Sequence, residues 1–244
     1  MTDKTPPTPS STIMLVHGQH DAFEVLMVER NVEIEFAGGA FVFPGGKITS
    51  ADFGPADTEN IEIESAKIAA IRETFEETGI LLATDANGEP VFEKHKADLT
   101  LRFEIEKNPH LFPEFLRQNR YSLQSNELNA YAIWVTPKQY KRRFATWFFV
   151  AELQSKIEPL IDGKEAVSAL WLTPSAALFD CKNGSKSMMF PTICNLKMLD
   201  NYRDIGEIVT AASSRNIPKI DPVPLLIGGK WEITLDPNYG YPID

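Results

Sequence analysis

The chain has 244 residues, of which 43% are hydrophobic and 24% charged, and its formal net charge at pH 7 is −10. This composition is ordinary for a soluble globular protein, and the length favours one large domain, which we place over residues 1–244. The acidic balance argues against nucleic acid or a membrane as partner, because phosphate backbones and anionic lipids need clustered Lys and Arg.

The sequence carries no signal for secretion or for a disulfide framework. No apolar run approaches the roughly 18 residues of a membrane span, and residues 1–11 are polar and Pro-rich without an apolar signal core. Only Cys181 and Cys194 are present, which is too few for a framework of disulfides. We therefore expect a cytoplasmic protein with reduced thiols.

Three strands are predicted in the first part of the chain. Residues 12–17 and 23–28 are strand-like, and the turn formers at 18–21 between them indicate a hairpin. A short strand at 40–43 delivers the Pro-Gly-Gly turn at 44–46. Glycines without Cβ atoms let the backbone approach a metal ion or a phosphate, so this turn is a candidate binding element.

A helix is predicted over residues 66–78, with Ser65 as its N-cap and Gly79 at its C′ position. Residues 48–60, which connect the glycine turn to this helix, are rich in turn formers such as Asp52, and we expect an extruded loop there.

One face of this helix is crowded with charge. Glu73, Glu76 and Glu77 stand at i, i+3 and i+4 and share a face, with Arg72 beside them. Like charges at this spacing cost a free helix about 0.2–0.5 kcal/mol per pair, whereas a divalent cation would offset the repulsion. The face therefore predicts a site for a hard metal ion.

The remaining elements alternate between helix and strand. The pattern from 91 to about 128 is helical, and we interpret it as an insertion that covers part of a cleft. Further expected elements are strands at 130–135, 146–151 and 165–172, a helix from Pro174, a last helix from 192 to about 213, and a hairpin around Gly228-Gly229.

The glycine turn and the charged helix together resemble the Nudix box. That pattern is Gly, five residues, Glu, seven residues, Arg-Glu, an apolar residue, one residue, Glu-Glu, one residue, Gly and an apolar residue. Glu64 stands eight positions before Arg72, as the pattern asks, while Thr74 replaces the apolar residue and the gap from Gly46 to Glu64 is twelve residues too long. The five fixed residues from Arg-Glu to Gly arise by chance at about one position in a million.

The chain outside the box is similar to a bacterial Nudix branch resembling peroxisomal CoA diphosphatases. The similarity lies in the Leu-Met-Val-Glu-Arg run at 26–30, the long insertion and the segment 165–171, although no His follows Arg30-Asn31 as in the CoA signature. The resemblance implies an α/β fold of the Nudix type, an α/β/α sandwich with a mixed sheet. It places the box at 45–80, the helical insertion at about 91–128, and a C-terminal helix and tail at about 185–244.

The same resemblance implies hydrolysis of the diphosphate linkage of a nucleoside diphosphate derivative, with CoA or acyl-CoA as candidate substrates and Mg²⁺ or Mn²⁺ as cofactor. The implied metal ligands are Glu73, Glu76 and Glu77, with the carbonyl of Gly45 or Gly46. The alternative is a non-catalytic Nudix-like module that binds a nucleotide or regulates. A homodimer through the insertion and the C-terminal tail is a further hypothesis.

Other candidate residues surround this set. Glu73 on the helix and Glu165 on a loop entering a strand are both candidates for the general base. Arg72 would orient the glutamates, and Glu64 would reach back to Arg72 if the helix begins after Ser65; otherwise Glu64 only favours the helix N-terminus. The candidates for phosphate binding are Arg30, Arg142 and Arg143. Arg142 and Arg143 could bind substrate phosphates bidentately, but cations that flank a strand are usually solvated, and for these two we favour the solvated interpretation.

Overall fold

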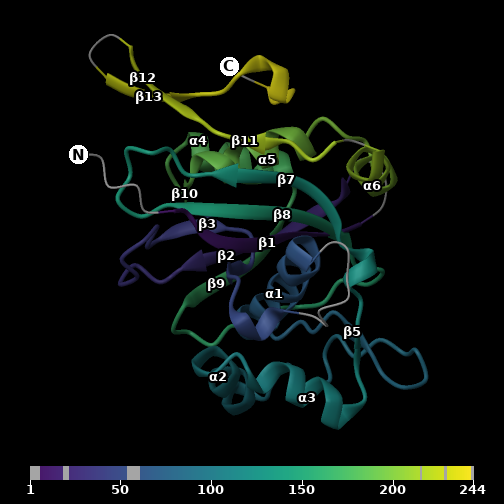
Figure 1. The fold of residues 1–244 in the computed structure, drawn as a ribbon. Helices are drawn as coiled ribbons and strands as arrows, with labels where there is room; N and C mark the ends of the chain where they lie inside the picture. Colours follow the sequence, from purple (N-terminus) through teal and green to yellow (C-terminus); the bar gives the residue numbers. More distant parts are fainter. Residues whose placement is uncertain (1–5, 19–21, 54–60, 215, 228–229, 243–244) are drawn as a thin grey trace.

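The computed structural model describes residues 6–18, 22–53, 61–214, 216–227 and 230–242. Its centre is a nine-stranded mixed sheet in the order β10-β3-β2-β1-β8-β7-β11, with β4 paired to β1 and β9 paired to β2 (Figure 1). The strands are β1 (Thr8–His17), β2 (Glu24–Arg30), β3 (Ala40–Val42), β4 (Gly45–Lys47), β7 (Asn129–Val135), β8 (Phe144–Glu152), β9 (Ala166–Leu172), β10 (Ser187–Met188) and β11 (Lys219–Ile220).

The sheet opens between β1 and β2. β1 runs parallel to β8 from Thr8 to Val16, but it pairs with β2 only at Val16 and His17. β4 takes the edge that β2 leaves free and pairs with Ser10, Ser11 and Thr12 of β1. The glycine turn therefore enters the sheet where its two halves diverge.

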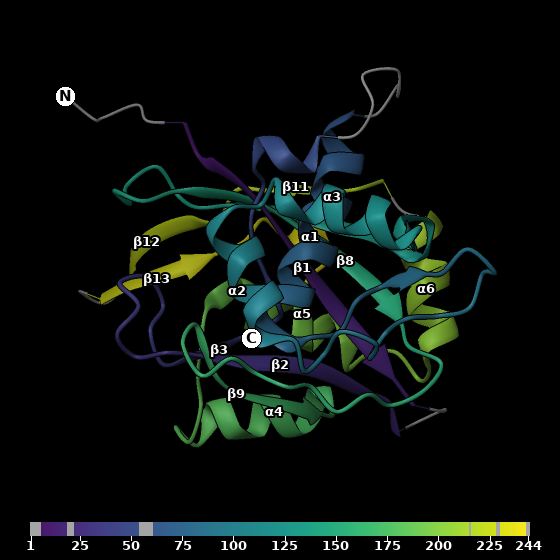
Figure 2. The ribbon, with the colours of Figure 1, turned by 90° about the horizontal axis from the view of Figure 1, so that it is seen from below.

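Helices cover both faces of the sheet, because side chains along a strand point alternately to opposite faces. Ile13 and Leu15 of β1 pack into one core with α1, α2 and α3, whereas Met14 and Val16 pack into the other with α4, α5 and α6 (Figures 1 and 2). The helices are α1 (Ile61–Thr78), α2 (Leu99–Lys107), α3 (Leu111–Asn119), α4 (Pro174–Lys182), α5 (Phe190–Leu199) and α6 (Ile205–Ser214). The expected α/β/α sandwich with a mixed sheet is confirmed.

The predicted insertion consists of two short helices, α2 and α3, on the outer side of α1. Phe115 of α3 stacks on Phe75 of α1, with ring centroids 5.9 Å apart and planes at 3°. Both side chains are buried, and burial of a phenyl group contributes about 1.5–3 kcal/mol. A small sheet of β5 (Ala83–Thr84) and β6 (Ser122–Leu123) closes the insertion.

Most strand predictions are confirmed, and β8 is buried on both faces from Trp147 to Ala151. The proline-led helix is confirmed as α4, and the Thr173 side chain accepts the N–H of Ala176 at 3.2 Å. Gly79 follows α1 with φ +75°, the conformation expected of a C′ glycine.

Two helix predictions are wrong. The helix begins at Ile61, and Ser65 is not its N-cap but a buried residue within it, since Glu62 and Glu64 in the first turn favour the helix N-terminus. The predicted helix from 192 to 213 is divided into α5 and α6 by residues 200–204. Asp204 accepts the N–H of Glu207 at 2.9 Å and so begins a new helix.

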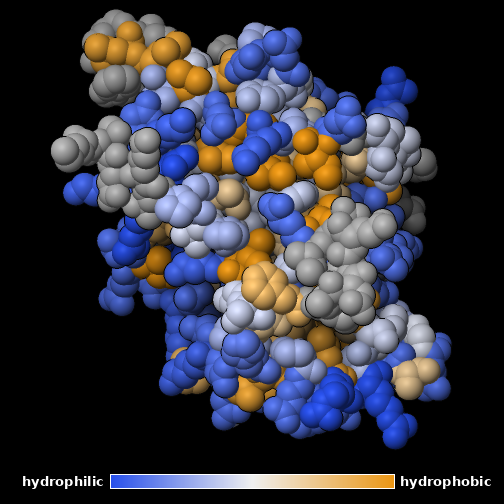
Figure 3. Space-filling view, in the orientation of Figure 1, coloured by the Kyte–Doolittle hydropathy of each residue, from blue (hydrophilic) through white to orange (hydrophobic). Residues whose placement is uncertain are grey.

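The C-terminal tail contains a second small sheet, in which β12 (Val223–Ile227) pairs antiparallel with β13 (Lys230–Thr234). The turn predicted at Gly228-Gly229 lies outside the described residues, as does most of the turn predicted at 18–21. Val223, Leu225 and Leu226 are exposed, and Figures 1 and 3 show this hairpin projecting from the body with apolar residues on it. Over the described residues, no helix combines the length and apolarity that crossing a membrane requires.

Candidate active site

The glycine turn and α1 face each other across a short gap. The backbone N–H of Gly45 donates to Glu77 Oε2 at 3.0 Å. Gly45 has φ +152°, and a Cβ atom on it would lie 2.3 Å from the carbonyl oxygen of Ser11. Only glycine satisfies both the backbone angle and the close approach of β1.

Gly46 makes the second contact between the turn and the helix. A Cβ atom on Gly46 would lie 2.4 Å from the carboxyl carbon of Glu73. The Glu73 carboxylate therefore occupies the space that any other residue at position 46 would fill. This is the close backbone approach that the Pro-Gly-Gly sequence predicts.

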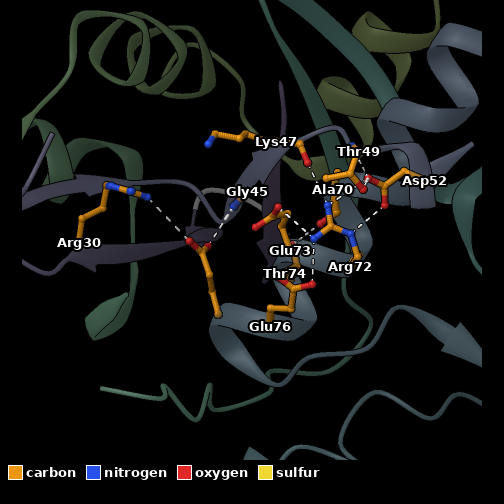
Figure 4. Close-up of polar contacts among 11 residues, drawn as sticks. Arg30, Gly45, Lys47, Thr49, Asp52, Ala70, Arg72, Glu73, Thr74 and Glu76 are labelled. Atoms are coloured by element: carbon orange, nitrogen blue, oxygen red, sulfur yellow. Dashed lines mark hydrogen bonds and ion pairs between the residues drawn. The ribbon is translucent and has the colours of Figure 1, made fainter. Parts of the chain in front are cut away.

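Arg72 is the organising cation of the site, and its side chain is only 2% exposed. Nη1 donates to Glu73 Oε1 at 3.0 Å and to Glu76 Oε1 at 2.8 Å. Nε and Nη2 donate to the two oxygens of Asp52 at 2.8 and 3.1 Å, and Nη2 also donates to the carbonyl of Lys47 (Figure 4). Burial alone would lower the pKa of Arg72, but the hydrogen bonds that Arg72 donates to Asp52 and the charges of Glu73 and Glu76 outweigh it and raise that pKa.

The three helix glutamates have raised pKa values, and in each case the largest cause is burial. The pKa of Glu76 rises to about 8, with repulsion from Glu73 adding to burial and Arg72 opposing it. The pKa of Glu73 is also raised by burial against the opposing charge of Arg72, and the pKa of Glu77 is raised well above its usual range by burial and the charge of Glu73. The single positive charge of Arg72 therefore does not balance the three glutamates.

These residues fit a divalent cation in their chemistry. Carboxylate oxygens are the ligands that Mg²⁺ and similar hard ions prefer, and such an ion would supply the missing positive charge. The contacts to Arg72 occupy Oε1 of Glu73 and Glu76, so Oε2 of each is available as a ligand. Within the described ranges, no group of three or more acidic, His or Cys side chains is already arranged to hold a metal ion. The assignment of Glu73, Glu76, Glu77, Gly45 and Gly46 as ligands stays a prediction.

Glu165 and Arg30 lie on the opposite side of the opening. Arg30 ends β2 and pairs with Ala166 of β9, so Glu165 is its neighbour across the ladder. Arg30 Nη1 approaches Glu77 Oε1 at 4.0 Å. The half-buried Glu165 lies close enough for its charge to raise the pKa values of Glu73 and Glu77 further. The structure thus brings both candidate bases and Arg30 to one site.

The other two candidate arginines lie in the connection between β7 and β8. Arg142 forms an exposed ion pair with Glu35 at 2.6 Å. Arg143 donates through Nε to the carbonyl of Thr136 at 3.0 Å. Their role in phosphate binding stays a prediction.

Asp52 corrects the sequence interpretation of the box. The sequence analysis interpreted Asp52 as a turn former in an extruded loop, but its side chain is 1% exposed and is paired with Arg72. Glu64 instead bonds to Lys67 at 3.1 Å, because the helix begins before it and holds it away from Arg72. Asp52 stands six positions after Gly46, where the pattern has Glu, so the twelve extra residues follow the acid rather than precede it.

Arg102 of α2 is a second residue that the sequence analysis missed. It is 1% exposed and donates from Nε and Nη2 to the carbonyl of Glu76, at 3.2 and 2.9 Å, and from Nη1 to the carbonyl of Lys96 at 2.9 Å. A guanidinium at a helix C-terminus stabilises the last carbonyls of that helix. No local pattern marks it, because its partner lies 26 residues earlier in the chain.

A mixed sheet between helical layers, with an Arg-Glu-x-x-Glu-Glu helix held against a Pro-Gly-Gly turn, defines the Nudix class of hydrolases. A family model described as the NUDT19 Nudix domain matches residues 62–199, more than half of the chain. The chain therefore belongs to this Nudix family.

Known proteins and structures agree with this assignment. The chain is 29% identical over 236 residues to the acyl-coenzyme A diphosphatase NUDT19 of Xenopus laevis, covering 76% of this chain and 62% of that protein. It is 22% identical over 237 residues to the protein of the same name in Homo sapiens, covering 77% and 63%. A NUDIX hydrolase from Alicyclobacillus acidocaldarius is 26% identical with a TM-score of 0.74, covering 88% of this chain and 99% of the other. The chain thus spans less than two thirds of these curated relatives.

Proposed function

We propose that this Nudix hydrolase cleaves the diphosphate linkage of CoA or an acyl-CoA and depends on Mg²⁺ or Mn²⁺. The observation that carries the proposal is the set of three glutamates held by Arg72 and the glycine turn, of which Glu76 and Glu77 are buried and Glu73 is partly buried. The substrate class is supported by the names of the relatives, which are acyl-coenzyme A diphosphatases.

The chain's own residues prepare the site in the following way. Arg72 fixes one oxygen of Glu73 and one of Glu76, and the Gly45 N–H fixes Glu77, so the carboxylates are oriented before substrate arrives. A bound divalent ion would neutralise charge on the phosphate oxygens and lower the pKa of the attacking water. Arg30, whose side chain is 20% exposed and lies 4.0 Å from Glu77, would contact a phosphate oxygen there; its exposure and this proximity support the role.

The general base is Glu73 or Glu165. Glu73 contacts Arg72, which favours its ionised form, whereas Glu165 makes no direct contact with that arginine among the described residues and lies on the β9 side. The pH dependence of kcat/KM in Glu73→Gln and Glu165→Gln separates them. The variant that lacks the base should lose the acidic limb of the profile.

A substrate panel tests the activity. CoA, acyl-CoA, ADP-ribose and dinucleotides are incubated with Mg²⁺ or Mn²⁺, and products are separated by chromatography. Glu76→Gln should lower kcat by orders of magnitude, because a metal ligand is lost. Glu62→Gln is the matched control on an exposed position of the same helix and should keep full activity. Nucleotide binding without any product would favour the non-catalytic module instead.

We also propose a homodimer and a cytoplasmic location. The exposed Val223, Leu225 and Leu226 of β12 support an association through the C-terminal tail, since a lone two-stranded hairpin is only marginally stable in water. Light scattering at micromolar protein tests the dimer, and a strictly monomeric species excludes it. Cys181 and Cys194, both free, are compatible with a reducing compartment, which cell fractionation tests.

A further inference from the structure

Two lysines from separate segments share one aromatic ring at the edge of the helical insertion. Lys107 of α2 and Lys164 of the loop before β9 place their ammonium nitrogens 4.0 and 3.2 Å from the ring centroid of Phe103. Since both distances end at the same centroid, the two nitrogens lie no more than about 7 Å apart. The ring holds two like charges close together.

Neither ammonium has a close ion-pair partner within the described part of the chain. Both side chains are exposed, and neither Lys107 nor Lys164 forms a side-chain hydrogen bond or an ion pair within 4.0 Å among the residues the structure describes. Other lysines do form such pairs, with acidic partners at 3.1 Å or less, namely Lys67, Lys96, Lys156 and Lys186. The donors of Lys107 and Lys164 therefore remain available to an anion.

This lysine pair adjoins the candidate active site. Lys164 directly precedes Glu165, whose charge acts on Glu73 and Glu77. Lys107 directly follows Glu106, whose pKa is raised by burial and by the charges of Glu165 and Asp162, while Lys164 and Lys107 act in the opposite direction. Figures 1 and 2 show the loop that leads into β9 running beside α2. A substrate with its diphosphate at the helix glutamates can thus extend toward Phe103.

We infer that Lys107 and Lys164, held on Phe103, form a subsite for a second phosphate of the substrate, the 3′-phosphate of a CoA-type nucleotide. An ammonium donates to a phosphate oxygen at about 2.8 Å, so one phosphate group bridges two ammonium nitrogens up to about 7–8 Å apart. A doubly charged phosphate also neutralises both lysines. The inference rests on the proposed function, because it assigns the subsite to a CoA-type substrate.

The kinetic test compares CoA with dephospho-CoA, which lacks only the 3′-phosphate. The wild-type protein should prefer CoA in kcat/KM, and Lys107→Gln with Lys164→Gln should remove that preference by raising KM for CoA, by about tenfold per lysine. Hydrolysis of dephospho-CoA should be unchanged. Lys94→Gln is the matched control, because Lys94 lies over the ring of Tyr121 in the same insertion, 5.4 Å from its centroid, and it should keep the wild-type preference.

Binding without catalysis gives an independent measurement. Calorimetry in EDTA should show that the wild-type protein binds adenosine 3′,5′-bisphosphate more tightly than AMP, and that the double variant binds the two alike. The proposed subsite is overturned if the double variant loses kcat/KM equally on CoA and dephospho-CoA. It is also overturned if the double variant still binds the bisphosphate more tightly than AMP. If no diphosphate is hydrolysed at all, the proposed function fails while the binding measurement still decides the lysine pair. Thermal unfolding verifies that each variant is folded.

Discussion

The ion pair between Asp52 and Arg72 should contribute strongly to the stability of the site. Asp52 accepts two hydrogen bonds from Arg72 and two more from the backbone N–H and hydroxyl of Thr49, at 2.7 and 2.9 Å. Asp52→Ala removes these acceptors and leaves part of a buried guanidinium without a partner. Breaking a buried pair costs about 3–5 kcal/mol, and the remaining contacts of Arg72 to Glu73 and Glu76 place the expected loss near the lower end, about 3 kcal/mol.

The matched control is Glu64→Ala, which changes the acid that sequence spacing alone assigns to the box. The Glu64 side chain is 31% exposed and pairs with Lys67 on the surface of α1. Exposed ion pairs contribute about 0–1 kcal/mol, so this variant should be close to wild type. Urea denaturation followed by circular dichroism at constant pH gives the free energy of unfolding of both variants.

Asp52→Ala should also lower the catalytic activity more than Glu64→Ala does. Without Asp52, Arg72 loses the contacts that fix its Nε and one donor of Nη2, so the carboxylates of Glu73 and Glu76 are held less firmly, and kcat should fall by about 10–100-fold. Glu64→Ala should retain kcat. If Glu64→Ala costs as much unfolding free energy as Asp52→Ala, or if Asp52→Ala costs less than about 1 kcal/mol, the reassignment of the box acid is wrong.

Three further predictions concern the same site. Gly45→Ala should prevent stable folding, because the added Cβ meets the backbone of β1. Gly46→Ala should mainly lower kcat, because its Cβ meets the Glu73 carboxylate, which can move. Thermal unfolding and kinetic measurements distinguish these two effects. In metal-free protein the pKa of Glu76 is about 8, against a usual value of 4.5, so between these pH values the folded state binds a proton that the unfolded chain releases. The free energy of unfolding should therefore fall as the pH rises from about 4.5 to 8. Glu76→Gln should make the free energy of unfolding depend less on pH in this range. Arg102→Met should cost about 2–4 kcal/mol in urea denaturation, because it leaves buried carbonyls without donors, and a loss below 1 kcal/mol would contradict its role.

The elements that sequence periodicity predicts well are those whose own residues determine their environment. β1 and β8 are recognisable because long apolar runs must be buried on both faces, and the charged face of α1 because three acids repeat at helical spacing. Asp52 was missed although its distance from Gly46 fits the pattern, because Asp replaces Glu and the surrounding turn formers suggested a solvated loop. Arg102 was unpredictable, since only tertiary packing brings α2 onto the end of α1.

The position of the twelve extra residues in the sequence explains why the spatial arrangement of the box residues is preserved. Arg72 binds both the carbonyl of Lys47 and the carboxylate of Asp52, so the arc between these residues is fixed at both ends by one guanidinium. A change of length inside this arc would displace one of the two acceptors. The twelve extra residues follow Asp52 in the sequence and therefore lie outside this arc, and doubling the length of a loop costs only about 0.6 kcal/mol in closure entropy. The box therefore accepts an insertion after its acid at little cost, and the linear spacing is lost while the spatial arrangement of Asp52, Arg72 and the glutamates is kept.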